Sequence, residues 1–217
     1  MDFDTPLSGW FDYIAWNIDL STRGPFVKAS TVRLDYQHRL SDLAKELRDE
    51  GVVAAHALEI KMIVPIQGGP RYDLALVVHS SEQMLDELVE RAAALGLPDP
   101  KLKLTGHNSG RIGNTETRDG EILLNHFAGD VPSDQAVEAW KSVAEWYARV
   151  LKIDSSTLIE FSSAAPFLIM NYAVLPGRAV PFLAGQLLRP SFYRVVRARL
   201  HAAGITPFPI IGKRLGS

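Results

Sequence analysis

The chain has 217 residues, 47% of them hydrophobic, which is enough to build the core of one large domain or two small ones. Lysine and arginine number 23 against 25 aspartate and glutamate, so the net charge of -2 gives no reason to expect nucleic acid as a partner. Cysteine is absent, which excludes disulfides, thiolate zinc sites and a cysteine nucleophile.

The N-terminal sequence MDFDTPLSGW is acidic, whereas a secretory signal begins with basic residues. No apolar stretch reaches the roughly 20 residues that a helix needs to cross a bilayer. We therefore expect a cytoplasmic protein that does not insert stably into a membrane.

The first half of the sequence alternates strand and helix signals. Aromatic and branched residues favour strands, and apolar residues at spacings of three or four favour helices. The predicted elements are a strand at 11–20, a helix from Val32 to Gly51, a hairpin of strands at 57–67 and 72–80, a helix capped by Ser80 or Ser81 and ending at Gly96, and a strand at 101–107.

The second half repeats this order after a polar, glycine-rich stretch. Asn17 and Asn125, which end similar apolar runs, are 108 residues apart, half the chain, as a tandem duplication would place them. The predicted elements are a strand at 121–127, a helix at 132–153, strands at 156–161 and 167–177, a helical region at 178–203 broken by Pro190, and a strand at 208–215.

Both halves thus have the βαββαβ order of the ferredoxin-like fold. We predict an α+β protein with a first ferredoxin-like unit at 1–107, a linker at 108–119 and a second unit at 120–217. The strand FLIMNYAV is apolar on both faces, so its sheet needs a cover besides its helices. Packing the two sheets face to face would make a pseudo-dimeric α+β barrel with a cavity between them.

In this element order the chain resembles the dimeric α+β barrel superfamily, in a fused tandem form. That superfamily includes antibiotic-biosynthesis-type monooxygenases, EthD-like proteins and the haem-binding chlorite dismutase group. The resemblance implies an enzyme that acts on a hydrophobic or aromatic small molecule, by cofactor-independent oxygenation or a related decarboxylation or cyclisation. The alternative is a non-catalytic ligand-binding or scaffolding protein of the same fold. Whether two chains form a homodimer is left open.

Three asparagines are candidates for substrate binding: Asn17, Asn125 and Asn171. Asn125 and Asn171 lie on predicted neighbouring strands and could share a face, where their amides could orient a carbonyl or enolate oxygen. Alternatively, each amide satisfies a strand end or a bulge.

His126 and Tyr172 are the candidates for proton transfer, and Trp16 is a candidate platform for an aromatic substrate. In a regular strand His126 faces away from its neighbour Asn125. A buried neutral histidine and core aromatic residues would produce the same sequence pattern.

Metal and haem binding have little support in the sequence. The histidines form no HxH, HxxxH or HExxH motif, so we predict no metal site and no cofactor. The resemblance to the chlorite dismutase group implies haem as a cofactor. Haem is a minority alternative here, because no residue of this chain can be matched to the axial histidine that would bind the iron.

The segment 178–199 carries five arginines and no acidic residue. Such a basic, partly apolar segment can meet an acidic partner, a phosphorylated ligand or a membrane surface. Alternatively, it is a solvated face whose arginines pair with Asp134, Glu138 and Glu145.

Overall fold

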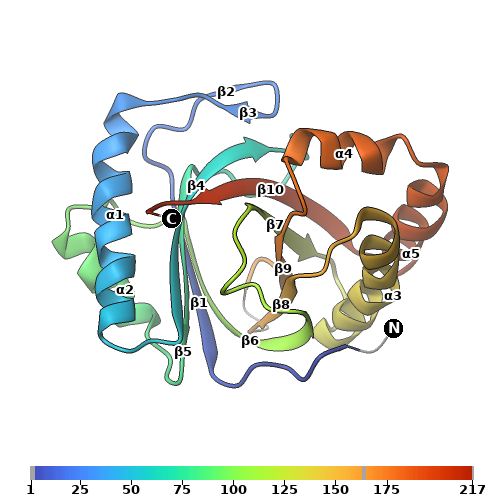
Figure 1. The fold of residues 1–217 in the computed structure, drawn as a ribbon, viewed down its shortest axis with the longest axis horizontal. Coiled ribbons are helices and arrows are strands. Elements are labelled where there is room, and N and C mark those ends of the chain that lie inside the picture. The colour runs from blue at the N-terminus through green and yellow to red at the C-terminus, as the bar shows by residue number, and fades with distance from the viewer. Residues whose placement is uncertain (1–2, 163–164, 217) are drawn as a thin grey trace. The chain divides into compact units, whose positions relative to one another are not determined.

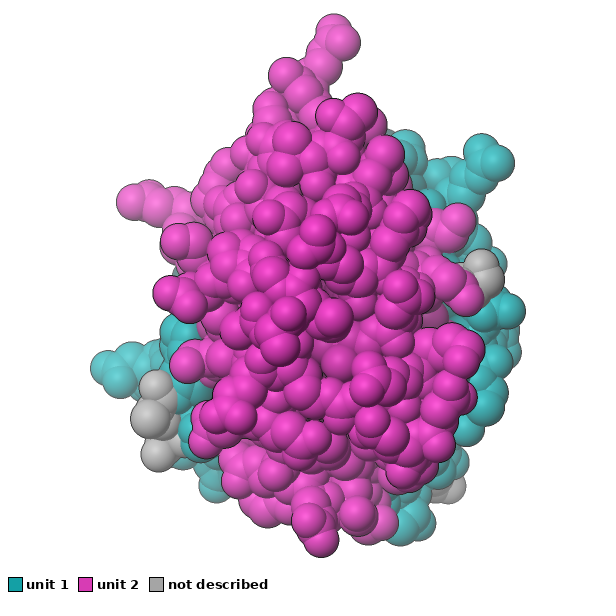
Figure 2. Space-filling view, turned by 90° about the vertical axis from the view of Figure 1, so that its left-hand side faces the viewer, with its two compact units in different colours: residues 1–7, 108–209 teal, residues 8–107, 210–217 magenta. Residues whose placement is uncertain are grey.

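The computed structural model describes residues 3–162 and 165–216. The chain divides into two compact units (Figure 2). Unit 1 consists of Met1–Leu7 and Asn108–Pro209, and unit 2 consists of Ser8–His107 and Ile210–Ser217. Each unit is described separately below.

Unit 2 contains the predicted βαββαβ order of the first half, with one small hairpin added (Figure 1). Its strands pair in the order β6-β1-β5-β4-β10, and the hairpin extends from β4. The elements are β1 (Trp10–Trp16), β2 (Thr22–Arg23), β3 (Phe26–Val27), α1 (Thr31–Asp49), β4 (Ala54–Ile63), β5 (Leu74–Ser80), α2 (Leu85–Ala94), and parts of β6 (Leu102–Ile112) and β10 (Thr206–Arg214).

Helix α1 begins one residue before its predicted start and ends two residues before its predicted end. The Ser30 side chain caps it by accepting a hydrogen bond from the Arg33 backbone N–H at 3.2 Å. Leu40, Leu43 and Leu47 recur on one side and are buried in the core cluster of unit 2. That cluster also contains Ile14 and Trp16 of β1 and Leu88 of α2, so α1 and α2 cover the same face of the sheet (Figure 1).

Unit 1 contains the elements of the second half. Its strands pair in the order β10-β7-β9-β8-β6. Its core cluster joins α3 and the last helices to one face of that sheet. The elements are β7 (Glu121–Ala128), α3 (Ser133–Leu151), β8 (Ser156–Phe161), β9 (Ile169–Val174), α4 (Ala179–Leu187), the π-helical turn η1 (Phe192–Arg197) and α5 (Ala198–Ala202). The break around Pro190 separates α4 from η1, as predicted.

Strands β6 and β10 contribute residues to both units. The first part of β10 pairs with β7 in unit 1, and its last residues pair with β4 in unit 2. The α+β class and the two successive ferredoxin-like element orders are as predicted.

Strand β6 is longer than the sequence indicates, because it continues to Ile112 through residues expected in the linker. The inward positions of this extension are Asn108 and Gly110, which are not typical core residues. The Asn108 amide donates to the carbonyl oxygen of Leu158 at 2.8 Å. A side chain at Gly110 would meet the ring of Trp140. Trp140 thus fills the space that an apolar strand residue would occupy.

Candidate functional site

Asn125 and Asn171 lie directly opposite each other on β7 and β9, so they share a face of the unit 1 sheet. This is the face that the helices cover. Leu158 pairs with Asn171, and Phe127 follows Asn125 by two residues; both belong to the core cluster with α3.

The two amides differ in their bonding. The Asn171 side-chain oxygen accepts a hydrogen bond from Ser156 Oγ at 2.6 Å, which is the structural role considered as an alternative for it. The Asn125 Oδ1 atom is buried and has no hydrogen-bond partner among the described residues. Such an oxygen is costly to bury, so Asn125 is the amide with capacity for a further hydrogen bond.

His126 and Tyr172 lie on the opposite face of the same sheet. His126 pairs with Met170, and Tyr172 is two residues further along β9 and pairs with Leu124. They are therefore diagonal neighbours, a relation that places residues roughly 7–8 Å apart in an antiparallel pair. The two candidates for proton transfer are thus close together, on the face turned away from the helices.

His126 is wholly buried, and its ring packs against that of Phe167 with centroids 4.9 Å apart. Burial lowers the pKa of His126 to about 3, although hydrogen bonds with the backbone of Phe208 and Leu124 act in the opposite direction. The imidazole is therefore neutral near pH 7, where it can give or accept a hydrogen bond but binds a proton weakly.

Two buried threonines lie near Tyr172 and were not identified from the sequence. Thr157 pairs with Tyr172 across β8 and β9, and its hydroxyl lies 2.7 Å from the hydroxyl of Thr115. Both threonines are at most 2% exposed. Threonine is common in strands for its shape alone, so the sequence carries no signal that would separate these two from packing residues.

The remaining sequence candidates, Trp16 and Asn17, belong to unit 2. Trp16 is fully buried in the core cluster beneath α1 and α2. Asn17 follows the end of β1, is exposed, and accepts a hydrogen bond from the Leu20 backbone N–H at 3.2 Å. This is the turn-forming role typical of asparagine.

Unit 2 has its own buried or partly buried titratable residues on the face turned away from its helices. Tyr13 and His56 lie there, because both pair with Val77 while Ile14 faces the helices. The hydroxyls of Tyr13 and Tyr72 are hydrogen-bonded to each other. Burial raises the pKa of both tyrosines and lowers the pKa of His56 to about 3. All these groups are therefore neutral near pH 7.

Asp12 of unit 2 is a fully buried carboxyl group, and burial raises its pKa. A raised pKa of this kind is typical of functional sites. Its bonding indicates a structural role instead. Asp12 accepts a hydrogen bond from the Met84 backbone N–H at 2.8 Å and another from the Thr105 hydroxyl. Met84 is the N-cap of α2, so Asp12 takes the capping role that was predicted for Ser80 or Ser81.

The burial of the Asp12 carboxyl group should make the stability of the folded protein depend on pH. Desolvation raises the pKa of Asp12 from 3.8 to about 6, so the folded protein holds the proton more strongly than the unfolded chain. The resulting stabilisation is complete below about pH 4 and is lost as the pH rises through about 6. Between pH 4 and pH 7, the free energy of unfolding of the wild type, measured with urea, should fall by up to about 3 kcal/mol more than that of Asp12→Asn. Parallel curves for the two proteins would contradict this assignment.

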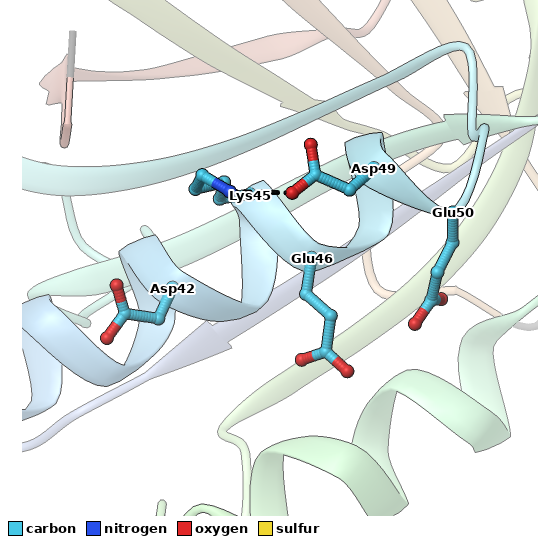
Figure 3. Close-up of a pocket in the computed structure, with 5 residues that line it drawn as sticks. All are labelled: Asp42, Lys45, Glu46, Asp49 and Glu50. Carbon is cyan, nitrogen blue, oxygen red and sulfur yellow. Dashed lines mark hydrogen bonds and ion pairs between the residues drawn. The ribbon is translucent and has the colours of Figure 1, made fainter.

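One hollow on the surface lies along α1 (Figure 3). Its lining carries charged side chains only, and Lys45 is paired with Asp49 at 2.6 Å. Such a lining does not suit a hydrophobic ligand. The lining residues are Asp42, Lys45, Glu46, Asp49 and Glu50.

Within residues 3–162 and 165–216, no group of three or more histidine and acidic side chains is arranged to hold a metal ion. In the same part of the chain, no helix is long and apolar enough to span a membrane.

Three of the histidines, His126, His201 and His79, do not fit a haem ligand. A haem-ligating imidazole presents one nitrogen to a broad apolar cavity. In unit 1, the His126 ring is hydrogen-bonded to backbone and packed on Phe167, and His201 is exposed on α5. In unit 2, His79 is bonded to the Ser8 carbonyl oxygen at 2.7 Å, and its ring is stacked on that of Phe11.

Comparisons with known proteins show the fold. No family model and no curated protein sequence matches the chain. Among solved structures, one from Lactobacillus acidophilus, of a protein assigned as a monooxygenase, is 9% identical over 95% of this chain and 94% of its own, with a TM-score of 0.56. A mutant chlorite dismutase from Candidatus Nitrospira defluvii is 10% identical over 94% of this chain and 90% of its own, with a TM-score of 0.56.

A heme-binding protein from Thermus thermophilus is 14% identical over 97% of this chain and 92% of its own, with a TM-score of 0.54. Identities this low carry no residue roles from one protein to another. Together with the strand order, they show that the chain has a tandem ferredoxin-like α+β fold.

Proposed function

We propose that this chain is a cytoplasmic enzyme that acts on a hydrophobic, aromatic small molecule at the His126–Tyr172 face of unit 1. The observation that carries the proposal is the placement of these two side chains as diagonal neighbours among apolar strand residues. A mostly apolar surface with a few convergent polar groups is the usual character of a small-molecule site. The structural likeness to a protein assigned as a monooxygenase adds support at the level of fold.

The two side chains suit different parts of the reaction. His126, with a pKa held at about 3 by burial, is a poor general base near pH 7 but can orient a substrate oxygen by hydrogen bonding. Tyr172, which pairs with Thr157 across β8 and β9, is then the group that passes a proton to or from the substrate. For a phenol-type substrate, the Tyr172 hydroxyl would accept the phenol proton while it passes its own proton on to water, and the resulting electron-rich phenolate ring can react with dioxygen directly, without a cofactor.

Oxygen uptake with hydroxylated naphthalenes and anthracenes, starting with 1-naphthol, tests this proposal. The wild type should consume oxygen, and Tyr172→Phe should lower the rate by about a hundredfold to ten-thousandfold, which is the usual contribution of a positioned proton-transfer group. The fold should tolerate the change, because phenylalanine keeps the ring that packs in the sheet.

Tyr147→Phe is the matched control. Tyr147 belongs to α3 in the same unit, on the other side of the sheet, and burial raises its pKa. Its loss of a hydroxyl should leave oxygen uptake unchanged. Equal rates for the wild type and Tyr172→Phe would refute the role given to Tyr172.

The alternative is a non-catalytic ligand-binding or scaffolding protein. Tight packing favours it, because His126 and Tyr172 are 0% and 3% exposed and a ligand would have to displace side chains to reach them. The Asn171–Ser156 hydrogen bond favours it as well. Binding of 1-naphthol without oxygen uptake or product would support a binding protein. A wild type that neither binds nor turns over the tested aromatics would leave a scaffolding role.

A further inference from the structure

Helix α4, drawn in orange in Figure 1, is apolar on its outward face as well as its inward face. Ala179 and Phe182 are buried, whereas Val180 and Leu187 are 53% and 52% exposed, and the next residue, Leu188, is 82% exposed. A helix that is apolar all round is normally covered on every side. The outward face of α4 therefore lacks the partner that its composition requires.

Arginines flank this apolar face. Arg178 and Arg189 lie at its two ends, and Arg194 and Arg197 follow on the exposed side of η1. These residues, with Val180, Leu187, Leu188 and Tyr193, form what we call the α4 surface.

The arginines of the α4 surface are not neutralised within the chain. None of them forms an ion pair with another described residue. Glu138, a predicted partner, is bonded to Lys141 at 2.8 Å instead. No acidic residue follows Glu160 in the sequence, although the whole chain carries more acidic than basic side chains. Positive charge is thus concentrated in one region of an otherwise acidic protein.

We propose that the α4 surface docks on an anionic phospholipid bilayer. The exposed aliphatic side chains would enter the boundary between headgroups and acyl chains, and the arginines would contact lipid phosphates. A bilayer of this kind satisfies both properties of the surface at once, since it offers negative charge above an apolar layer. Binding of this type is peripheral and needs no membrane-spanning helix.

A second copy of the chain fits this surface less well. In a two-fold symmetric contact the same patch meets itself, which would bring the arginines of both copies together without an acidic residue between them. Like charges facing each other across an interface oppose association. An acidic bilayer carries no such penalty.

Co-sedimentation of the full chain with unilamellar vesicles tests the proposal. We expect binding to vesicles of phosphatidylcholine and phosphatidylglycerol in equal amounts, and little binding to vesicles of phosphatidylcholine alone. Raising the salt concentration should weaken binding, because it screens the attraction between the arginines and the lipid phosphates. Removal of one arginine, as in Arg189→Gln, should lower the affinity about fivefold, and Arg178→Gln together with Arg189→Gln should lower it further.

The apolar part of the surface is tested separately. Leu187→Ser with Leu188→Ser should abolish most of the vesicle binding while keeping every arginine. The matched controls lie on unit 2: Val32→Ser with Leu34→Ser removes aliphatic side chains that are 57% and 49% exposed on α1, and Arg71→Gln removes an exposed arginine. The controls should bind vesicles as the wild type does, and thermal unfolding should show that all variants are folded.

Several results would overturn the proposal. A wild type that fails to sediment with the anionic vesicles at low salt would refute it, as would unchanged binding by the double serine variant. Light scattering gives a further check. If the chain is a dimer and the double serine variant is a monomer, the α4 surface is an interface between copies instead.

Discussion

Replacing Asp73 with alanine is expected to destabilise unit 2 by about 3–5 kcal/mol, because it leaves the buried Arg33 guanidinium without its close counter-charge. Arg33 is 1% exposed and its Nη1 lies 3.0 Å from Asp73 Oδ2. The Asp73 carboxylate also accepts hydrogen bonds from the backbone N–H groups of Ile18 and Asp19, at 2.8 and 2.9 Å. One carboxylate thus holds both the start of α1 and the segment that follows β1.

The measurement is urea unfolding of the wild type and the variant, with Asp49→Ala as the control. Asp49 also pairs with a cation, Lys45, but both side chains are more than half exposed, so its loss should cost less than about 1 kcal/mol. A loss below about 1 kcal/mol for Asp73→Ala as well would mean that Arg33 finds solvent or Glu59 after the change. Combining Asp73→Leu with Arg33→Met should cost less than Asp73→Ala alone, because no charge then remains buried.

The order of elements could be predicted from the sequence because each one carries its own periodicity. Leu40, Leu43 and Leu47 mark the buried side of α1, and the alternation around Leu58 and Ile60 marks β4. Both patterns are local, so they can be recognised in the sequence without knowing which elements pack against them. The α+β class follows from the order alone.

The orientation of the candidate residues could not be predicted in the same way. Strand β9 is buried on both faces, so alternation shows that Asn171 and Tyr172 point in opposite directions but not which one faces the helices. Pairing with Leu158, which contacts the α3 cluster, decides this for Asn171. Likewise, the sequence gives no sign that Asp12 caps α2, because residues 12 and 84 meet only in the folded sheet.

The residues of the predicted linker show a third limit of prediction from sequence. Glycine can lie in a strand or in a turn, and the sequence alone does not distinguish the two. Residues 108–112 belong to β6, where Gly110 makes room for Trp140. Gly113, three residues later, ends the strand with a positive φ of 60°. Both glycines read as loop residues in a single sequence, but only Gly113 requires the left-handed conformation that other residues avoid.

Gly113→Ala is accordingly expected to destabilise unit 1 by about 2–4 kcal/mol, the sum of a left-handed backbone penalty and of overpacking. A Cβ at this position would lie far inside contact distance of the Asp154 carbonyl oxygen, which is backbone and cannot rotate away. The Gly113 N–H also donates to the Asp4 carboxylate at 2.6 Å, which restrains the turn from the other side.

Gly177→Ala is the control, because a Cβ there meets no atom within 4 Å and Gly177 has no positive φ. Urea unfolding of that variant should match the wild type or exceed it by up to about 1 kcal/mol, since alanine restricts the unfolded chain. If Gly113→Ala were equally stable, the turn after β6 could move away from Asp154 without cost. The pairing of β6 with β8 would then depend on the Asn108 amide and the Trp140 ring rather than on the turn, and Asn108→Leu would become the more damaging change.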